Sequence, residues 1–149
     1  MRHTFGIAVL LLVTSANAGL EVPANKIQSY LPSKDVEKFV VEKLDLSTFR
    51  NSFGPRREPG MRSFADFGLR PKTASNGIIE FKEVDWNYTV TILGRRDYNN
   101  DGIEDLAIRF TDRSLVGSYQ TESQLLLTRY SNEGKLIAIA YELDVANLD

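Results

Sequence analysis

Apolar and polar residues alternate along the second half of the chain. Over 79–82 an apolar residue alternates with a charged one, and the same period of two recurs over 86–93 and 106–110. This period is typical of strands with one buried face, so three strands are predicted here. Two more are predicted over 124–130 and 135–143, joined by a hairpin turn with the sequence Asn-Glu-Gly.

The period changes to that of a helix in the part of the chain before these strands. Val36, Phe39 and Val40 recur at helical spacing, which predicts a helix over 34–44 with Ser33 as its N-cap. A second, short helix is predicted from Ser47 to the Gly-Pro pair at 54–55, because Phe49 and Phe53 lie four residues apart.

Together these elements predict the fold class and the domain organisation. A lone sheet cannot bury its apolar face, so the helices are expected to cover it. The expected fold is α+β, with N-terminal helices packed on an antiparallel sheet of about five strands. Residues 19–149 are long enough for a single globular domain of this kind.

The first eighteen residues have the three parts of a secretory signal. Arg2 supplies the positive charge, 5–13 is an unbroken run of apolar and small residues, and Ala16-Asn17-Ala18 has the small-x-small pattern of a cleavage site. The apolar run is far shorter than the roughly 20 residues of a membrane span. Residues 1–18 are therefore predicted to be a signal peptide. The protein is expected to be exported, either periplasmic or secreted, with no membrane anchor after cleavage.

The composition of the chain excludes several kinds of catalytic and metal site. The chain has no cysteine, and its one histidine, His3, belongs to the predicted signal peptide. This excludes a Ser-His-Asp triad, a cysteine nucleophile and the usual zinc sites from the mature protein. Loss of Arg2 changes the net charge from −2 to −3, which argues against a nucleic-acid partner. Any metal site must use oxygen ligands.

One stretch carries a metal-binding pattern. Residues 97–105 place oxygen-bearing side chains at loop positions 1, 3, 5 and 9: Asp97, Asn99, Asp101 and Asp105. Gly102 stands at position 6, where a calcium loop turns sharply, and the carbonyl of Ile103 at position 7 is the expected backbone ligand. These five residues are the predicted site for one Ca²⁺. The alternative is a polar hairpin loop without a metal, because Asp, Asn and Gly are common in turns.

The loop resembles the D-x-[DN]-x-D-G-x-x-D calcium loops of FG-GAP and VCBS repeats, thrombospondin type 3 repeats and dockerins. Residues 105–108 (Asp-Leu-Ala-Ile) are also similar to FG-GAP and VCBS sequences, in which the loop leads into a strand. The resemblance implies a calcium site and no whole-family function. Ile108 stands at position 12, where an EF-hand has a bidentate Glu, and the single copy excludes a propeller. The missing position-12 carboxylate leaves a shell that needs water or a distant group, and Asp85 and Asp112 are the candidate remote donors.

Two questions of function stay open at this point. No nucleophile and base stand together, so no catalytic residue is predicted and a binding or structural module is favoured. The alternative is a calcium-assisted hydrolase that uses carboxylates near the loop, with Glu83 and Asp85 as candidates. Separately, 50–72 has a net charge of +4 and is a candidate surface for an acidic protein or glycan partner; the alternative is a solvated loop.

The signal peptide gives the first testable prediction. Mass spectrometry of the protein recovered after export should show Gly19 as the amino-terminal residue, because cleavage is expected after Ala18. Recovery of a membrane-embedded chain that still begins at Met1, as the main product, would contradict it.

Overall fold

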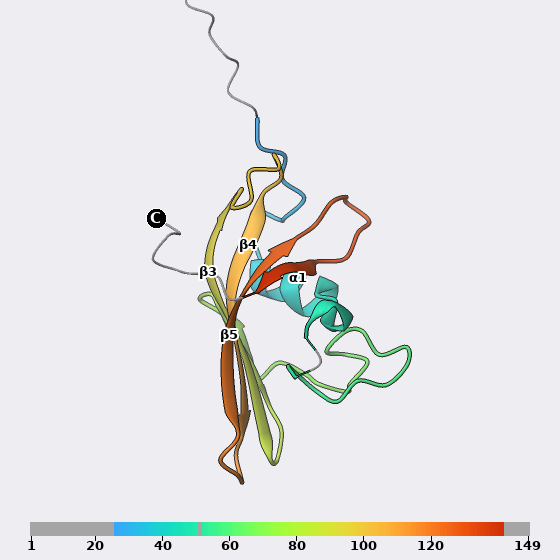
Figure 1. The fold of residues 1–149 in the computed structure, drawn as a ribbon, viewed down its shortest axis with the longest axis vertical. Helices are drawn as coiled ribbons and strands as arrows, with labels where there is room; N and C mark the ends of the chain where they lie inside the picture. Colours follow the sequence, from blue (N-terminus) through green and yellow to red (C-terminus); the bar gives the residue numbers. More distant parts are fainter. Residues whose placement is uncertain (1–25, 51, 142–149) are drawn as a thin grey trace, which may run out of the picture.

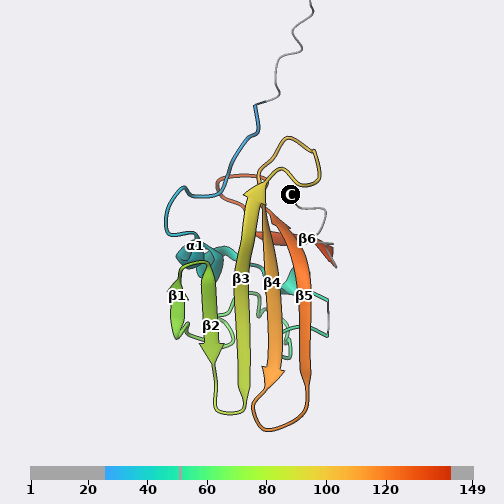
Figure 2. The ribbon, with the colours of Figure 1, turned by 90° about the vertical axis from the view of Figure 1, so that its left-hand side faces the viewer.

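The computed structural model describes residues 26–50 and 52–141, so the predicted signal peptide lies outside the described residues. Six strands form one sheet in sequence order, with every neighbouring pair antiparallel (Figure 2). The strands are β1 Thr73–Ser75, β2 Ile78–Lys82, β3 Trp86–Arg96, β4 Asp105–Ser114, β5 Gln120–Thr128 and β6 Ile137–Tyr141. Before them come the α-helix α1, Val36–Lys43, and the 3₁₀ turn η1, Leu46–Thr48.

The expectation of N-terminal helices on a sheet of about five strands is wrong. The described residues contain six strands and a single α-helix of eight residues. The additional strand, β1, is three exposed polar or small residues, so it has no apolar alternation to reveal it. It forms because the Asn76-Gly77 turn, where both residues have positive φ, folds it back onto β2.

The second predicted helix is also absent, for a local reason. Asp45 is the N-cap of η1, and its carboxylate accepts hydrogen bonds from the amide of Ser47, at 3.0 Å, and from the Ser47 hydroxyl, at 2.6 Å. The turn ends after three residues, and Phe49 then packs into the core. The four-residue spacing of Phe49 and Phe53 thus reflects two separate packing positions.

One face of the sheet carries the core, and α1, η1 and the long loop after η1 lie on that face (Figure 1). Phe110 of β4 is fully buried between the ring of Phe49, 5.1 Å away edge-on, and the ring of Tyr88, 6.3 Å away and stacked. Phe64 stacks on Phe81 at 3.9 Å. Aromatic side chains from the segment before the sheet thus fill the space over its apolar face.

The covering segment is also joined to the last strand. Leu44 forms an isolated parallel bridge with Leu136: the amide of Asp45 donates to the Leu136 carbonyl and the Leu136 amide donates to the Lys43 carbonyl. Two residues along, the amide of Ala138 donates to the Thr48 hydroxyl at 3.0 Å. The free edge of β6 is therefore partly paired, which limits edge-to-edge association.

The buried side chain of Arg129 connects three parts of the fold. Its guanidinium donates to the carbonyls of Gly134, Tyr30 and Asn132, and lies over the ring of Phe39 at 5.0 Å. The β5–β6 turn, the N-terminal segment and α1 thus share one cation.

A hydrogen bond from Gly77 to Glu37 gives a prediction about stability and pH. The Gly77 amide donates to the Glu37 carboxylate at 2.7 Å and lowers its pKa below the usual 4.5. Glu37→Gln should lower the free energy of unfolding by about 1 kcal/mol at pH 7, because the hydrogen bond loses its charge. A lowered pKa stabilises the fold above pH 4.5, so the difference should vanish as the pH falls through the folded-state pKa.

The measurement is urea unfolding at pH 7 and pH 3, with Glu42→Gln as the control on the exposed side of the same helix. An equal loss at both pH values, or an equal loss in the control, would contradict the assignment.

Candidate calcium site

The predicted calcium loop is the connection between β3, which ends at Arg96, and β4, which begins at Asp105. Two residues in it have left-handed backbone: Asn100, with a φ of 59°, and Gly102, with a φ of 84°. Asn tolerates this conformation and Gly adopts it freely, so the sequence supplies a suitable residue at each sharp turn. Figure 2 shows the loop at one end of the sheet and the β2–β3 and β4–β5 turns at the other.

Backbone amides orient the oxygens of the first loop positions. Asp97 accepts from the amide of Asp101 at 3.1 Å and from that of Gly102 at 2.8 Å. The Asp101 carboxylate accepts from the Ile103 amide at 2.9 Å and from the Asn99 side-chain amide at 2.9 Å. Since all these bonds join residues two to five positions apart, the local sequence is sufficient to fold the loop.

Asp105, at position 9, lies in a different environment. Its side chain is completely buried, and one oxygen accepts from the Tyr98 amide at 3.1 Å. The other oxygen, Oδ1, has no hydrogen-bond partner among the described residues. Burial raises the pKa of Asp105 and the charge of Asp101 adds to the rise, although the Thr128 side chain and the Tyr98 amide oppose it. A buried carboxylate with an unsatisfied oxygen is costly unless a cation or a donor compensates it.

Two further residues reach the loop from β5 and the residues after it. The register that pairs Leu106 with Leu127 places Thr128 beside Asp105, where its hydroxyl lowers the pKa of the Asp105 carboxyl. The contact lacks the geometry of a regular hydrogen bond, so neither the Thr128 hydroxyl nor Oδ1 of Asp105 has such a bond within the described residues. The pKa of Tyr130 is raised by partial burial and by the charges of Asp101 and Asp105, so its phenol responds to the loop carboxylates. Neither residue was expected at the site, because its position depends on strand pairing.

The two remote ligands expected from the sequence are not at the loop. Asp85 lies in the β2–β3 turn, and Asp112 is paired with Tyr88 in the other half of β4. Asp112 is buried at the opposite end, where it accepts from the indole of Trp86 and from the Gly54 amide. The whole length of β3, about 33 Å for 11 residues at the usual rise, separates that end from the loop.

The loop oxygens do not converge on one point. Across 26–50 and 52–141, no three acidic side chains lie close enough together to hold a metal ion. Asp97, Asn99 and Asp101 form one hydrogen-bonded group, and Asp105 is connected to them through Tyr98. An ion would therefore require the carboxylates to move toward each other.

Tyr98, which stands between Asp97 and Asn99 in the sequence, folds back over β3. A Cβ atom added to Gly94 would lie only 2.4 Å from the Tyr98 hydroxyl, and the Arg96 guanidinium lies 4.7 Å from the ring centroid. Glycine at 94, next to a register shift in the β3–β4 pairing, makes room for the ring. Asn100 is exposed and is the intervening residue with the least structural role.

Some of the cationic side chains in the basic segment 50–72 stabilise the fold. Arg57 donates to the carbonyls of Ser47, Phe49 and Arg50, and Arg62 pairs with the buried carboxylate of Asp45. Burial alone would raise the pKa of Asp45, but Arg62 and the Ser47 hydrogen bonds outweigh it and hold the pKa below its usual value. The exposed cations of the segment that stay open to a partner include Arg56, Arg70 and Lys72.

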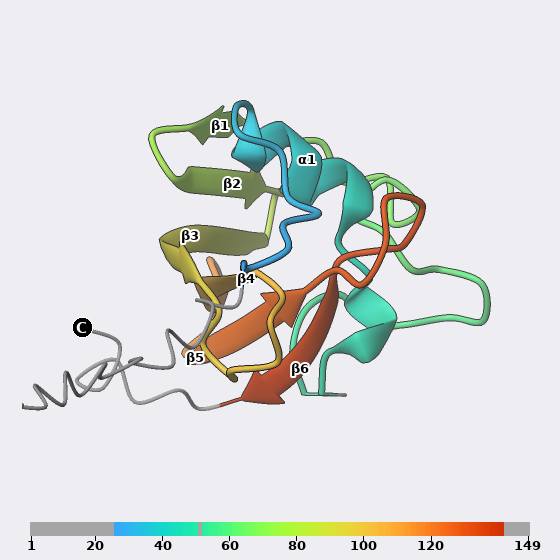
Figure 3. The same ribbon diagram turned by 90° about the horizontal axis from the view of Figure 1, so that it is seen from above.

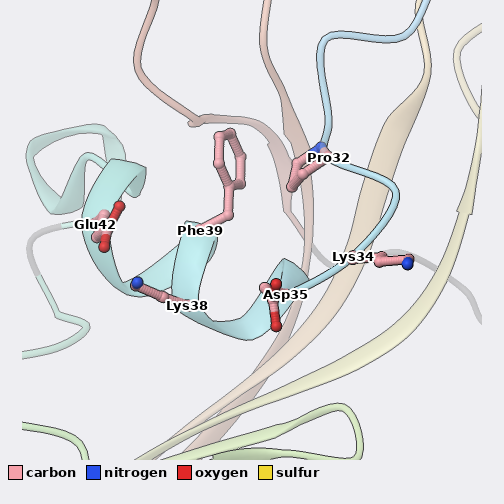
Figure 4. Close-up of a pocket in the computed structure, with 6 residues that line it drawn as sticks. All are labelled: Pro32, Lys34, Asp35, Lys38, Phe39 and Glu42. Carbon is pink, nitrogen blue, oxygen red and sulfur yellow. The ribbon is translucent and has the colours of Figure 1, made fainter.

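A hollow lies beside α1, with six residues lining it (Figure 4). It measures about 240 Å³, and four of its six lining residues are charged: Lys34, Asp35, Lys38 and Glu42. Pockets for small ligands are usually about 300–1,000 Å³ and mostly apolar, so the hollow does not have their chemistry.

Comparison with protein-family models, with curated proteins and with solved structures finds no match for this chain. Within the residues that the structure describes, no helix has both the length and the apolar character needed to cross a membrane.

The neighbouring arginines Arg56 and Arg57 differ in their contribution to stability. Arg57→Ala should lower the free energy of unfolding by about 1 kcal/mol, because three carbonyls lose a charged donor. Arg56→Ala removes the same charge from an exposed position and should leave stability within about 0.5 kcal/mol. Urea unfolding of both variants is the measurement; equal effects would contradict the structural role of Arg57.

Proposed function

We propose that this protein is a small exported module whose β3–β4 loop binds one Ca²⁺, and that its role is binding or structural rather than catalytic. One observation supports it above the others: Asp105 is completely buried, and its Oδ1 lacks a regular hydrogen bond in the described part of the chain, at the end of a loop that also carries Asp97 and Asp101.

Electrostatics favours a cation at this place. Asp97, Asp101 and Asp105 lie within nine consecutive residues. The nearby cation of Arg95 is engaged elsewhere: it forms an ion pair with Glu104 at 2.7 Å and donates to the Pro32 carbonyl. A bound divalent ion would reduce the repulsion among the carboxylates and satisfy the unpaired oxygen of Asp105.

The donor set suits calcium. Asp97, Asn99, Asp101, the Ile103 carbonyl and Asp105 are all hard oxygen ligands, and Thr128 adds a hydroxyl beside Asp105. Calcium accepts six to eight oxygens in flexible geometry, whereas magnesium requires a tight octahedron. A carboxylate has about four lone-pair sites, so it can keep its bond to a backbone amide while it binds an ion.

Affinity should be modest, because the oxygens must first move together. The absence of a position-12 carboxylate points the same way. Both features suggest a dissociation constant of about 10⁻⁵–10⁻³ M, the range of weak sensors and extracellular modules. The signal-peptide pattern of 1–18 supports a location where such calcium concentrations occur.

The hydrolase alternative receives no support from the geometry. Glu83 and Asp85 lie in the β2–β3 turn, at the opposite end of the sheet from the loop. A hydrolytic carboxylate must be within hydrogen-bond reach of the reacting group or of a water that the ion activates. These two side chains therefore do not serve a metal at Asp97–Asp105.

Calcium titration by calorimetry, combined with thermal unfolding, tests the proposal. Calcium at one hundred times its dissociation constant should raise the free energy of unfolding by about 2.7 kcal/mol. Asp105→Asn should abolish this gain while keeping an acceptor for the Tyr98 amide. Without calcium the same variant should be at least as stable as the unmutated protein, because a buried charge has been removed.

Asn100→Gly is the matched control, since it changes an exposed residue of the same loop whose φ of 59° glycine adopts easily. It should keep the full response to calcium. Trp86 fluorescence is unsuitable as a readout, because Trp86 begins β3 at the end remote from the loop. If millimolar calcium releases no heat and shifts no melting temperature in the unmutated protein, the loop is a polar turn.

A further inference from the structure

We infer that residues 26–32, named here the clasp, dock on the β3–β4 loop, and that calcium in the loop controls how firmly the clasp is held. The inference rests on the proposed function and adds to it a regulated element within the same chain. Figure 3 shows the clasp, in blue, running from the start of α1 toward the loop that follows β3.

Backbone hydrogen bonds join the clasp to the ligand-bearing part of the loop. The Gln28 amide donates to the Gly102 carbonyl at 2.8 Å, and the Glu104 amide donates to the Gln28 carbonyl at 2.8 Å. Gln28 thereby forms a parallel bridge with Ile103, the residue whose carbonyl is the proposed ligand. The two bonds fix the peptide groups on both sides of Ile103, and the second of these groups contains the ligand carbonyl.

Side chains reinforce this contact at the base of the loop. The carboxylate of Glu104 accepts from the Ser29 hydroxyl at 2.6 Å and from the Arg95 guanidinium at 2.7 and 3.2 Å. Another nitrogen of the same guanidinium donates to the Pro32 carbonyl at 2.7 Å. Glu104 and Arg95 thus hold the middle and the C-terminal end of the clasp, and Glu104 directly precedes the buried Asp105.

The coupling follows from linkage between the two events. An ion that binds Asp101, the Ile103 carbonyl and Asp105 restricts the backbone of the intervening residues, to which the clasp is bonded. Docking should therefore strengthen in calcium and, by reciprocity, a docked clasp should increase calcium affinity. Within the clasp, residues 26–29 are exposed, whereas Leu31 is buried in the core. Exposed contacts open locally, so the docking equilibrium concerns this first part of the clasp and is accessible to measurement.

Amide hydrogen exchange on the purified protein, with and without saturating calcium, is the primary test. The Gln28 and Glu104 amides should exchange at least about fivefold more slowly in calcium, the lower end of the range typical of coupling between sites. The Leu115 amide, bonded to the Asp85 carbonyl at the remote end of the sheet, is the internal control and should not change.

Ser29→Ala gives the reciprocal measurement. Ser29 is uncharged and lies outside the loop, so it can affect calcium only through the clasp; its loss should weaken calcium binding about threefold by calorimetry. Ser33→Ala, at an exposed neighbour, should leave the affinity unchanged. Calcium binding with unaltered exchange at Gln28 and unaltered affinity in Ser29→Ala would overturn the clasp while the proposed function stands. Absence of calcium binding would overturn both.

Discussion

The apolar face of the sheet must be covered, and residues 26–72 are the part of the described chain that covers it. Only eight of them form an α-helix, so most of this layer is irregular backbone over a hydrophobic surface. Irregular backbone cannot satisfy its own amides and carbonyls, and each buried group needs a partner from elsewhere. The need for these partners explains why charged side chains occur where a helical layer would have none.

Four ionic side chains meet this requirement in distinct ways. Asp45 is the cap of η1, Arg57 and Arg129 donate to carbonyls of the covering layer and its neighbours, and Asp112 accepts the Gly54 amide. Hydrogen bonds to charged groups are stronger than neutral ones, which suits a layer with little regular structure. The charges that look like a binding surface in the sequence are thus partly structural.

Most of the strands could be predicted from the sequence, because burial of one face of a sheet makes apolar and polar residues alternate along each strand. Strands over 79–82, 86–93 and 106–110 lie within β2, β3 and β4, and the helical spacing of Val36 and Val40 lies within α1. The helix cap was misplaced, since Asp35 rather than Ser33 occupies that position, in left-handed backbone. The strand β1 has no apolar signal at all, and only its turn was visible.

Some residues of the candidate site are positioned by local contacts, and others by contacts between strands that are distant in the sequence. Asp97, Asn99, Asp101 and Gly102 are arranged by hydrogen bonds within the loop, so their register could be read directly from the sequence. Burial of Asp105 and the approach of Thr128 depend on how β4 pairs with β5, which spacing alone does not determine. The same reason explains why Asp85 and Asp112 were placed wrongly: both belong to the far end of the sheet.

The covering layer precedes the sheet in the chain, and this order has a consequence for folding. Each strand can pair with the one made just before it, because the sheet follows sequence order. The covering layer has no such neighbour: Tyr30 is bonded to a residue 99 positions later, and Thr48 to one 90 positions later. Such distant contacts form late, after the entropy of closing a long loop has been lost. The segment that precedes the sheet in the chain is therefore among the last to find its partners. Until these contacts form, the apolar face of the sheet is exposed and prone to association with other chains.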